Sequence, residues 1–342
     1  MKTNKSVLIW LITGAILIAA MVVVGGITRL TNSGLSMVEW EPVMGTLPPM
    51  NETDWQDAFT NYKSYPEYKE INYDFTLEDF KSIFWWEYAH RLLGRIIGVI
   101  FIVPFLIFWI KGYFDKSWIL RLLILLVLGA GQGVLGWFMV KSGLVDNPDV
   151  SHYRLAAHLI AAILLFSYTI WLALDWKYPE KGYMRVKTFQ QTLLFVFLVA
   201  IAQITYGAFM AGLKAGLFYP TYPKMNGDWI PAGLEGKLFS SGWVFLTSNI
   251  TAIQFMHRWL AILLTLMIIA LYYNYGPSLI ERNKKRLLAL VIVVLIQVGL
   301  GIITIVYNIP IIIALLHQIT ALALIAIFIM NMHGARVVST PN

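Results

Sequence analysis

The sequence has no cysteine and few charged residues. None of its 342 residues is cysteine, and only 13% are Asp, Glu, Lys or Arg. The absence of cysteine excludes disulfide bonds, thiolate metal sites and thiol nucleophiles. Any bound metal or cofactor must therefore be held by other side chains.

Hydrophobic residues make up 58% of the chain, a fraction that suits a lipid bilayer rather than a water-soluble core. Eight apolar runs, each near the roughly 20 residues that cross the hydrocarbon layer, predict eight transmembrane helices. The runs lie at residues 7–24, 83–110, 118–140, 155–174, 192–213, 250–273, 287–307 and 311–330. We therefore expect an all-α integral membrane protein.

The segments between these runs differ in charge. Lys and Arg occur at Lys2 and Lys5, at residues 111–121, 177–187 and 282–286, and at Arg336. The alternate segments are longer and, at residues 28–82, acidic and rich in Trp and Tyr. The positive-inside rule then places both termini in the cytoplasm. Residues 28–82 predict a partly helical external cap.

The first apolar run lacks a signal-peptide cleavage site and is expected to be retained as a helix. No Arg-rich presequence precedes it, which favours a multi-pass protein of a bacterial inner (plasma) membrane. The net charge of +7 is spread over short loops. This distribution predicts contact with anionic lipid headgroups and no nucleic-acid binding.

Two halves of the chain resemble each other. Matching positions are Gly25, Gly34 and Leu35 with Gly207, Gly216 and Leu217; Glu-Tyr-Ala-His-Arg at 87–91 with Gln-Phe-Met-His-Arg at 254–258; Gln132 and Gly136 with Gln297 and Gly301; and His158 with His317. The repeat predicts two pseudo-symmetric four-helix bundles. We expect one at residues 1–175, with the external cap, and the other at residues 190–333.

Four histidines lie inside apolar runs, at His90, His158, His257 and His317. An ionisable residue in a membrane span is costly, so a functional role is the first interpretation. A neutral histidine that donates to a neighbouring helix carbonyl is the alternative, but equivalent repeat positions argue against it. All four lie near the external ends of their helices, and each is followed at i+4 by Gly or Ala. His152 and His333 are expected to be interfacial.

Two imidazoles from facing helices are a common way to hold haem iron. The predicted pairs are His90 with His158 and His257 with His317. Copper or zinc is less favoured because neither repeat offers a third ligand at that depth. Arg91, Arg95 and Arg258 lie close to these ligands in sequence and are candidates for binding haem propionates. The alternative is that these arginines reach lipid phosphates.

The repeats differ at one informative position, where the first has Glu87 and the second has Gln254. Glu87 lies three residues before His90 and therefore on the same helix face. A carboxylate there could accept a proton or stabilise developing positive charge. The alternative is a structural pair with Arg91 at i+4.

The chain resembles the haem A synthase family, in the group without paired external cysteines. The resemblance covers nearly the whole chain and rests on residues 25–36, 40–49, 87–95 and 254–258. It implies oxidation of a porphyrin methyl group of haem O to a formyl group, giving haem A for terminal oxidases. The missing cysteine pairs exclude any disulfide step, so more of the hypothesis rests on Glu87.

The resemblance also implies roles for single residues. His90 and His158 would hold the substrate haem O with Glu87 as the catalytic carboxylate, and His257 and His317 would hold a haem B. Haem O synthase and oxidase assembly factors are expected partners, with a homo-oligomer possible and the haem sites toward the periplasm. Two other functions stay open: a di-haem b-type electron-transfer protein and a haem chaperone for oxidase assembly.

Overall fold

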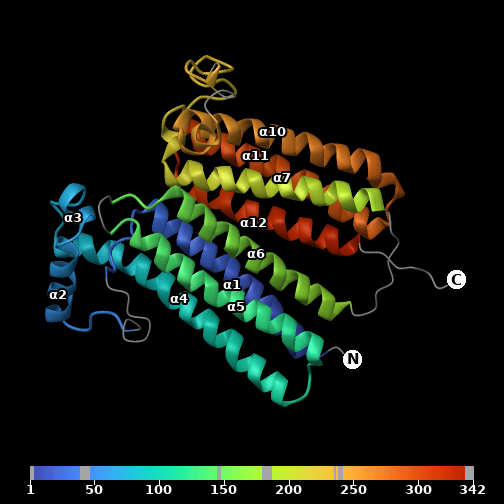
Figure 1. Ribbon diagram of the computed structural model, residues 1–342, viewed down its shortest axis with the longest axis horizontal. Helices are drawn as coiled ribbons and strands as arrows, with labels where there is room; N and C mark the ends of the chain where they lie inside the picture. Colours follow the sequence, from blue (N-terminus) through green and yellow to red (C-terminus); the bar gives the residue numbers. More distant parts are fainter. Residues whose placement is uncertain are drawn as a thin grey trace. The chain divides into compact units, whose positions relative to one another are not determined.

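The computed structural model describes residues 4–38, 47–144, 148–178, 187–234, 236–237 and 242–335. Within these ranges eight helices are long and apolar enough to cross a membrane, which confirms the eight predicted spans (Figure 1). They are α1 (Lys5–Leu30), α4 (Leu77–Ile110), α5 (Lys116–Lys141), α6 (His152–Lys177), α7 (Lys187–Gly212), α10 (Ile250–Tyr275), α11 (Glu281–Val306) and α12 (Ile311–Gly334). The protein is an all-α, multi-pass membrane protein.

The chain forms two compact units. One comprises residues 13–165 and includes α4 and α5, which run side by side in Figure 1. The other comprises the described parts of residues 1–12 and 166–342, in which α10 packs against α7 and α11, and α11 against α12. The predicted boundaries at 1–175 and 190–333, the pseudo-symmetry and the cytoplasmic termini stay predictions. Lys2, Arg336 and residues 179–186, on which part of the orientation rests, lie outside the described residues.

Local sequence signals set where several helices begin. Asp115 and Asn249 cap α5 and α10 through their side-chain oxygens, which accept hydrogen bonds from backbone N–H groups. Thr76 and Asp79 form a reciprocal capping box at the start of α4. This box starts α4 at Leu77, so the helix extends outward beyond the apolar run that predicted it.

The described part of residues 28–82, the segment predicted to form a cap, is partly helical, as predicted. It contains α2 (Glu52–Lys63) and α3 (Pro66–Glu70), drawn beside the first turns of α4 in Figure 1. Buried aromatic and aliphatic side chains join α2 to the first turns of α4. They are Trp55, Phe59 and Tyr62 from α2 and Phe80, Ile83, Phe84 and Tyr88 from α4. Residues 40–46 of the motif at 40–49 lie outside the described residues.

His333 is buried, in contrast to its expected interfacial position. Its Nε2 lies 3.1 Å from a carboxylate oxygen of Asp175, and its ring meets Trp171 edge to face. The apolar run predicted the end of the last span at residue 330, but α12 continues to Gly334. That extra turn carries His333 to α6.

Candidate functional site

His90 and His158 each lie against a glycine of another helix. A Cβ added at Gly25 of α1 would be 3.0 Å from Nε2 of His90, and one at Gly136 of α5 would be 3.3 Å from Cε1 of His158. Real Cβ atoms rarely approach so closely, so only glycine leaves room for these rings. The two imidazoles are near enough to interact electrostatically.

His257 and His317 repeat this arrangement in the other unit. A Cβ at Gly207 of α7 would be 3.2 Å from Cε1 of His257, and one at Gly301 of α11 would be 3.0 Å from Cε1 of His317. These two imidazoles also interact electrostatically. The structure therefore brings together the members of both predicted pairs.

The hydrogen bonds of His317 determine which ring nitrogen can bind a metal. Its Nδ1 lies 3.1 Å from the backbone carbonyl oxygen of Gln297, which can only accept, so Nδ1 carries the proton and donates. Nε2 is then the unprotonated nitrogen, and the side-chain amide of Gln297 lies 3.2 Å from it. A fixed Nδ1–H with an unprotonated Nε2 is the usual state of an iron-binding histidine, and the Gln297 amide that now donates to Nε2 would have to move aside for a metal.

The donor set fits haem iron rather than a bare metal ion. Within the described ranges no group of three or more His, Asp or Glu side chains could hold a metal ion. Two imidazoles would be enough to hold the iron of a haem, whose ring supplies the other ligands. Nδ1 of His158 is buried and has no hydrogen-bond partner among the described residues, so no protein group fixes which nitrogen of this imidazole carries the proton.

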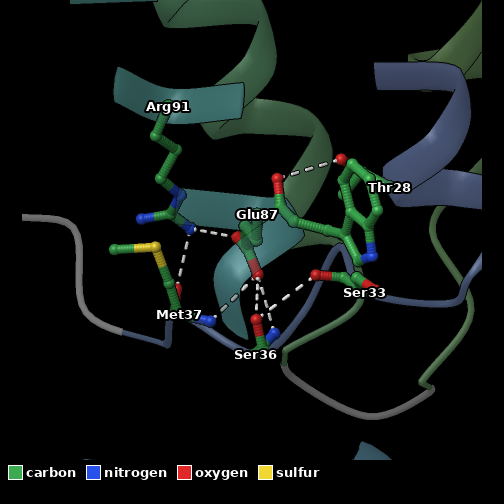
Figure 2. Close-up of polar contacts among 7 residues, drawn as sticks. Thr28, Ser33, Ser36, Met37, Glu87 and Arg91 are labelled. Atoms are coloured by element: carbon green, nitrogen blue, oxygen red, sulfur yellow. Dashed lines mark hydrogen bonds and ion pairs between the residues drawn. The ribbon is translucent and has the colours of Figure 1, made fainter. Parts of the chain in front are cut away.

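Glu87 is buried in the first half of α4, with 3% of its surface exposed, and both of its carboxylate oxygens accept hydrogen bonds (Figure 2). Its Oε2 accepts from the backbone N–H groups of Ser36 and Met37, at 2.8 and 2.9 Å, and from the Ser36 hydroxyl at 2.8 Å. Its Oε1 pairs with Arg91 at 2.6 Å. Arg91 also donates to the carbonyl of Met37 at 2.7 Å. Glu87 and Arg91 together hold residues 36–37 against α4.

Gln254 and Arg258 hold a different loop against α10. The Gln254 side chain donates to the carbonyl of Tyr219 at 2.9 Å. The Arg258 guanidinium donates to the carbonyls of Tyr219 and Thr221 at 2.6 and 2.7 Å. This loop presents carbonyl oxygens, whereas the loop beside Glu87 presents N–H groups. The polarity of the loop backbone therefore explains an amide at 254 and a carboxylate at 87.

The three arginines that are candidates for binding propionates differ in how many of their N–H donors already bind protein groups. Arg91 pairs with Glu87 and Met37, which is the structural pair considered as the alternative in the sequence. Arg258 keeps one buried donor, Nε, without a partner among the described residues. Arg95 is partly buried on α4. Their role in binding propionates stays a prediction.

The sequence did not lead us to predict that a glycine of another helix would lie against each of the four histidines. It named Gly94, Ala162, Ala261 and Ala321, which follow the histidines on the same helices, but Gly94 instead faces Met21 of α1. Gly25, Gly136, Gly207 and Gly301 were visible only as repeat matches. Their pairing across the repeats was the signal that could have identified them.

Comparisons with known proteins identify the family of this chain. Residues 8–329 match the sequence profile of the COX15-CtaA family, described as cytochrome oxidase assembly protein. The chain belongs to this family. It is 43% identical over 339 residues to a haem A synthase of Flavobacterium johnsoniae, covering 97% of this chain and 98% of that protein. It is 42% identical to a haem A synthase of Paramagnetospirillum magneticum, covering 96% and 94% of the two chains.

A haem A synthase of Ehrlichia canis is 43% identical, covering 94% of this chain and 91% of that protein. The matched residues 8–329 include both histidine pairs of this chain and at least part of each of its eight spans. The resemblance inferred from the sequence motifs is confirmed.

Proposed function

We propose that the protein is a haem A synthase, an oxidoreductase that converts a methyl group of haem O to a formyl group. Near full-length similarity of over 40% to haem A synthases carries this conclusion. The reaction hydroxylates the methyl carbon successively and then loses water, so the enzyme must hold the macrocycle still while its edge reacts. Two histidine pairs, each packed on glycine, suit that task.

His90 and His158 are assigned to the substrate haem O, and His257 and His317 to a resident haem B. Iron supplies the redox chemistry when the haems are bound, and the imidazoles orient the ring planes. The hydrogen bonds to His257 and His317 support the resident assignment because they fix those rings in place. Nδ1 of His158 lacks such a bond within the described residues, as suits a site that releases its product.

Glu87 is assigned to the substrate pocket, where its contacts favour an electrostatic role over proton transfer. Both oxygens are occupied, and accepting a proton would disrupt the pair with Arg91 or the bonds from Ser36. A carboxylate held in this way can stabilise positive charge that develops nearby. It also holds residues 36–37 over the external end of α4.

The expected location is a bacterial inner membrane, with both haem sites toward the periplasm. The substrate requires an upstream reaction that attaches the farnesyl tail of haem O, so haem O synthase is a proposed partner, and oxidase assembly factors would receive the product. Self-association into a homo-oligomer is part of the same proposal.

Haem extraction from protein purified out of cells that make haems B and O tests the function. We expect haem B together with haem O, its hydroxylated form or haem A. His90→Ala is expected to lose the farnesylated haems and keep haem B, and His257→Ala is expected to do the reverse. Haem B alone in the unaltered protein would favour an electron-transfer protein, and bound haem O or haem A without turnover would favour a chaperone.

A further inference from the structure

The two histidine pairs differ in the polar groups beside them. In the C-terminal half the side-chain amide nitrogen of Gln203 lies 3.1 Å from Nδ1 of His257 and 3.5 Å from its Nε2. In the N-terminal half no hydrogen bond joins His90 to any described residue. Gln203 lies one turn before Gly207, and the corresponding residue one turn before Gly25 is Met21.

Met21 cannot offer its histidine the amide group that Gln203 offers. Its terminal methyl group lies 3.3 Å from the position of a Cβ on Gly94, one turn beyond His90. A thioether is at most a weak hydrogen-bond acceptor and adapts easily to its surroundings. The substitution of methionine for glutamine therefore removes a directional contact and keeps a similar volume.

Gln203 is built to fix the orientation of His257. Its Oε1 is buried and has no hydrogen-bond partner among the described residues. A half-turn of the amide would bring Oε1 to the place that its Nε2 now occupies, where Nδ1–H of His257 could donate to it. With its proton on Nδ1, His257 would have an unprotonated Nε2, as His317 has through the Gln297 carbonyl.

We propose that Gln203 is a positioning residue that makes the C-terminal histidine pair a permanent haem site, and that Met21 makes the N-terminal pair an exchangeable one. This inference rests on the proposed function, because it takes both pairs to be haem ligands. A hydrogen bond to the outer nitrogen of a metal-bound histidine fixes the ring and makes it a stronger ligand. The protein thereby keeps one haem while it takes up and releases the other.

The test exchanges the two residues. Gln203→Met is expected to weaken retention of haem B by about 10–100-fold, the usual effect of losing such a partner. It is also expected to raise the reduction potential of that haem, because a less electron-rich imidazole stabilises ferric iron less. Transfer to apomyoglobin measures retention, and a redox titration followed by visible absorbance measures the potential. Gln203→His, which keeps a hydrogen-bonding group, is expected to restore part of both.

Met21→Gln is the reciprocal variant and gives an answer even if Gln203→Met folds poorly. It is expected to slow transfer of the farnesylated haem to apomyoglobin. Unchanged retention and potential in Gln203→Met, with haem B lost in His257→Ala, would overturn the inference and leave the proposed function standing. Haem B retained in His257→Ala would instead overturn the haem assignment and the inference with it.

Discussion

Gly25 lies so close to His90 that a methyl group on its Cα would be 3.0 Å from Nε2 of the ring. The same contact recurs between Gly207 and His257 at 3.2 Å, with the nearest ring atom now Cε1. Each histidine thus packs on the backbone of a neighbouring helix, which limits how its ring can turn. The position of the ring is set jointly by the helix that carries it and the helix that it touches.

Gly25→Ala and Gly207→Ala are therefore expected to push their histidines aside. Each variant should lose most of the haem of its own pocket and keep the haem of the other pocket. The added methyl group would contact a rigid imidazole ring, which cannot bend away as the end of a flexible side chain can. Extraction and chromatography of the haems measures this. Gly299→Ala and Gly133→Ala are matched controls, since a Cβ there meets nothing within 4 Å. Equal haem loss in the controls would show that helix geometry, and not the ring contact, is responsible.

Glu87→Gln is expected to abolish formyl production while both haems stay bound. A glutamine keeps the shape of the side chain but removes the charge that pairs with Arg91 and offers one oxygen to the three donors of Ser36 and Met37. Pigment extraction and mass spectrometry of the haems would report the product. Normal haem A from this variant would remove Glu87 from the mechanism.

Ser36→Ala separates the charge of Glu87 from its hold on the loop. It removes one hydroxyl hydrogen bond and keeps the carboxylate and both backbone N–H groups, so we expect partial activity.

Gln254→Glu is the converse of Glu87→Gln. It would place a carboxylate against the carbonyl of Tyr219 and remove the present hydrogen bond. We expect that variant to be less stable by about 1–3 kcal/mol, measured by thermal unfolding in detergent.

The cap is expected to lose stability at alkaline pH. Burial raises the pKa of Tyr62 above its ordinary value, and the neighbouring Glu67 carboxylate raises it further. A group whose pKa is higher in the folded than in the unfolded protein stabilises the folded state at pH values below its unfolded pKa, which is 10.0 for tyrosine. This stabilisation is lost as the pH rises through the pKa of the folded protein. Near-ultraviolet tyrosinate absorbance and thermal unfolding would follow the change.

Tyr62→Phe is the control for that titration. It removes the hydroxyl that donates to Glu67 at 3.0 Å and accepts from Asn72 at 2.8 Å. We expect lower stability near neutral pH, by about 1–3 kcal/mol, and a weaker dependence above pH 10. An unchanged alkaline transition in the variant would assign the titration to another group.

Asp175→Asn is expected to destabilise the contact between α6 and α12 without changing haem content. The carboxylate of Asp175 is the hydrogen-bond partner of the buried His333 at 3.1 Å. Weakening this bond should cost about 1–3 kcal/mol in the free energy of unfolding. Thermal unfolding with parallel haem extraction checks it, and selective loss of haem B would indicate that this contact also supports the haem pocket.

The sequence by itself determined the eight spans, the four histidines at equivalent positions and the family. These follow from composition and spacing: long apolar runs have few alternatives to a membrane helix, and an ionisable residue within one is conspicuous. The sequence also predicted that the external segment would be partly helical, and α2 and α3 bear this out.

Only the tertiary structure decided which groups meet. The packing of His90 on Gly25 depends on how α1 and α4 are rotated about their axes, which a uniformly apolar run does not record. The contacts of Glu87 and Gln254 depend on whether a distant loop turns N–H or carbonyl groups toward the helix. Nearly every residue type carries the same backbone N–H and carbonyl groups, so the sequence of a loop does not reveal which of them faces the helix. Only the folded structure shows it.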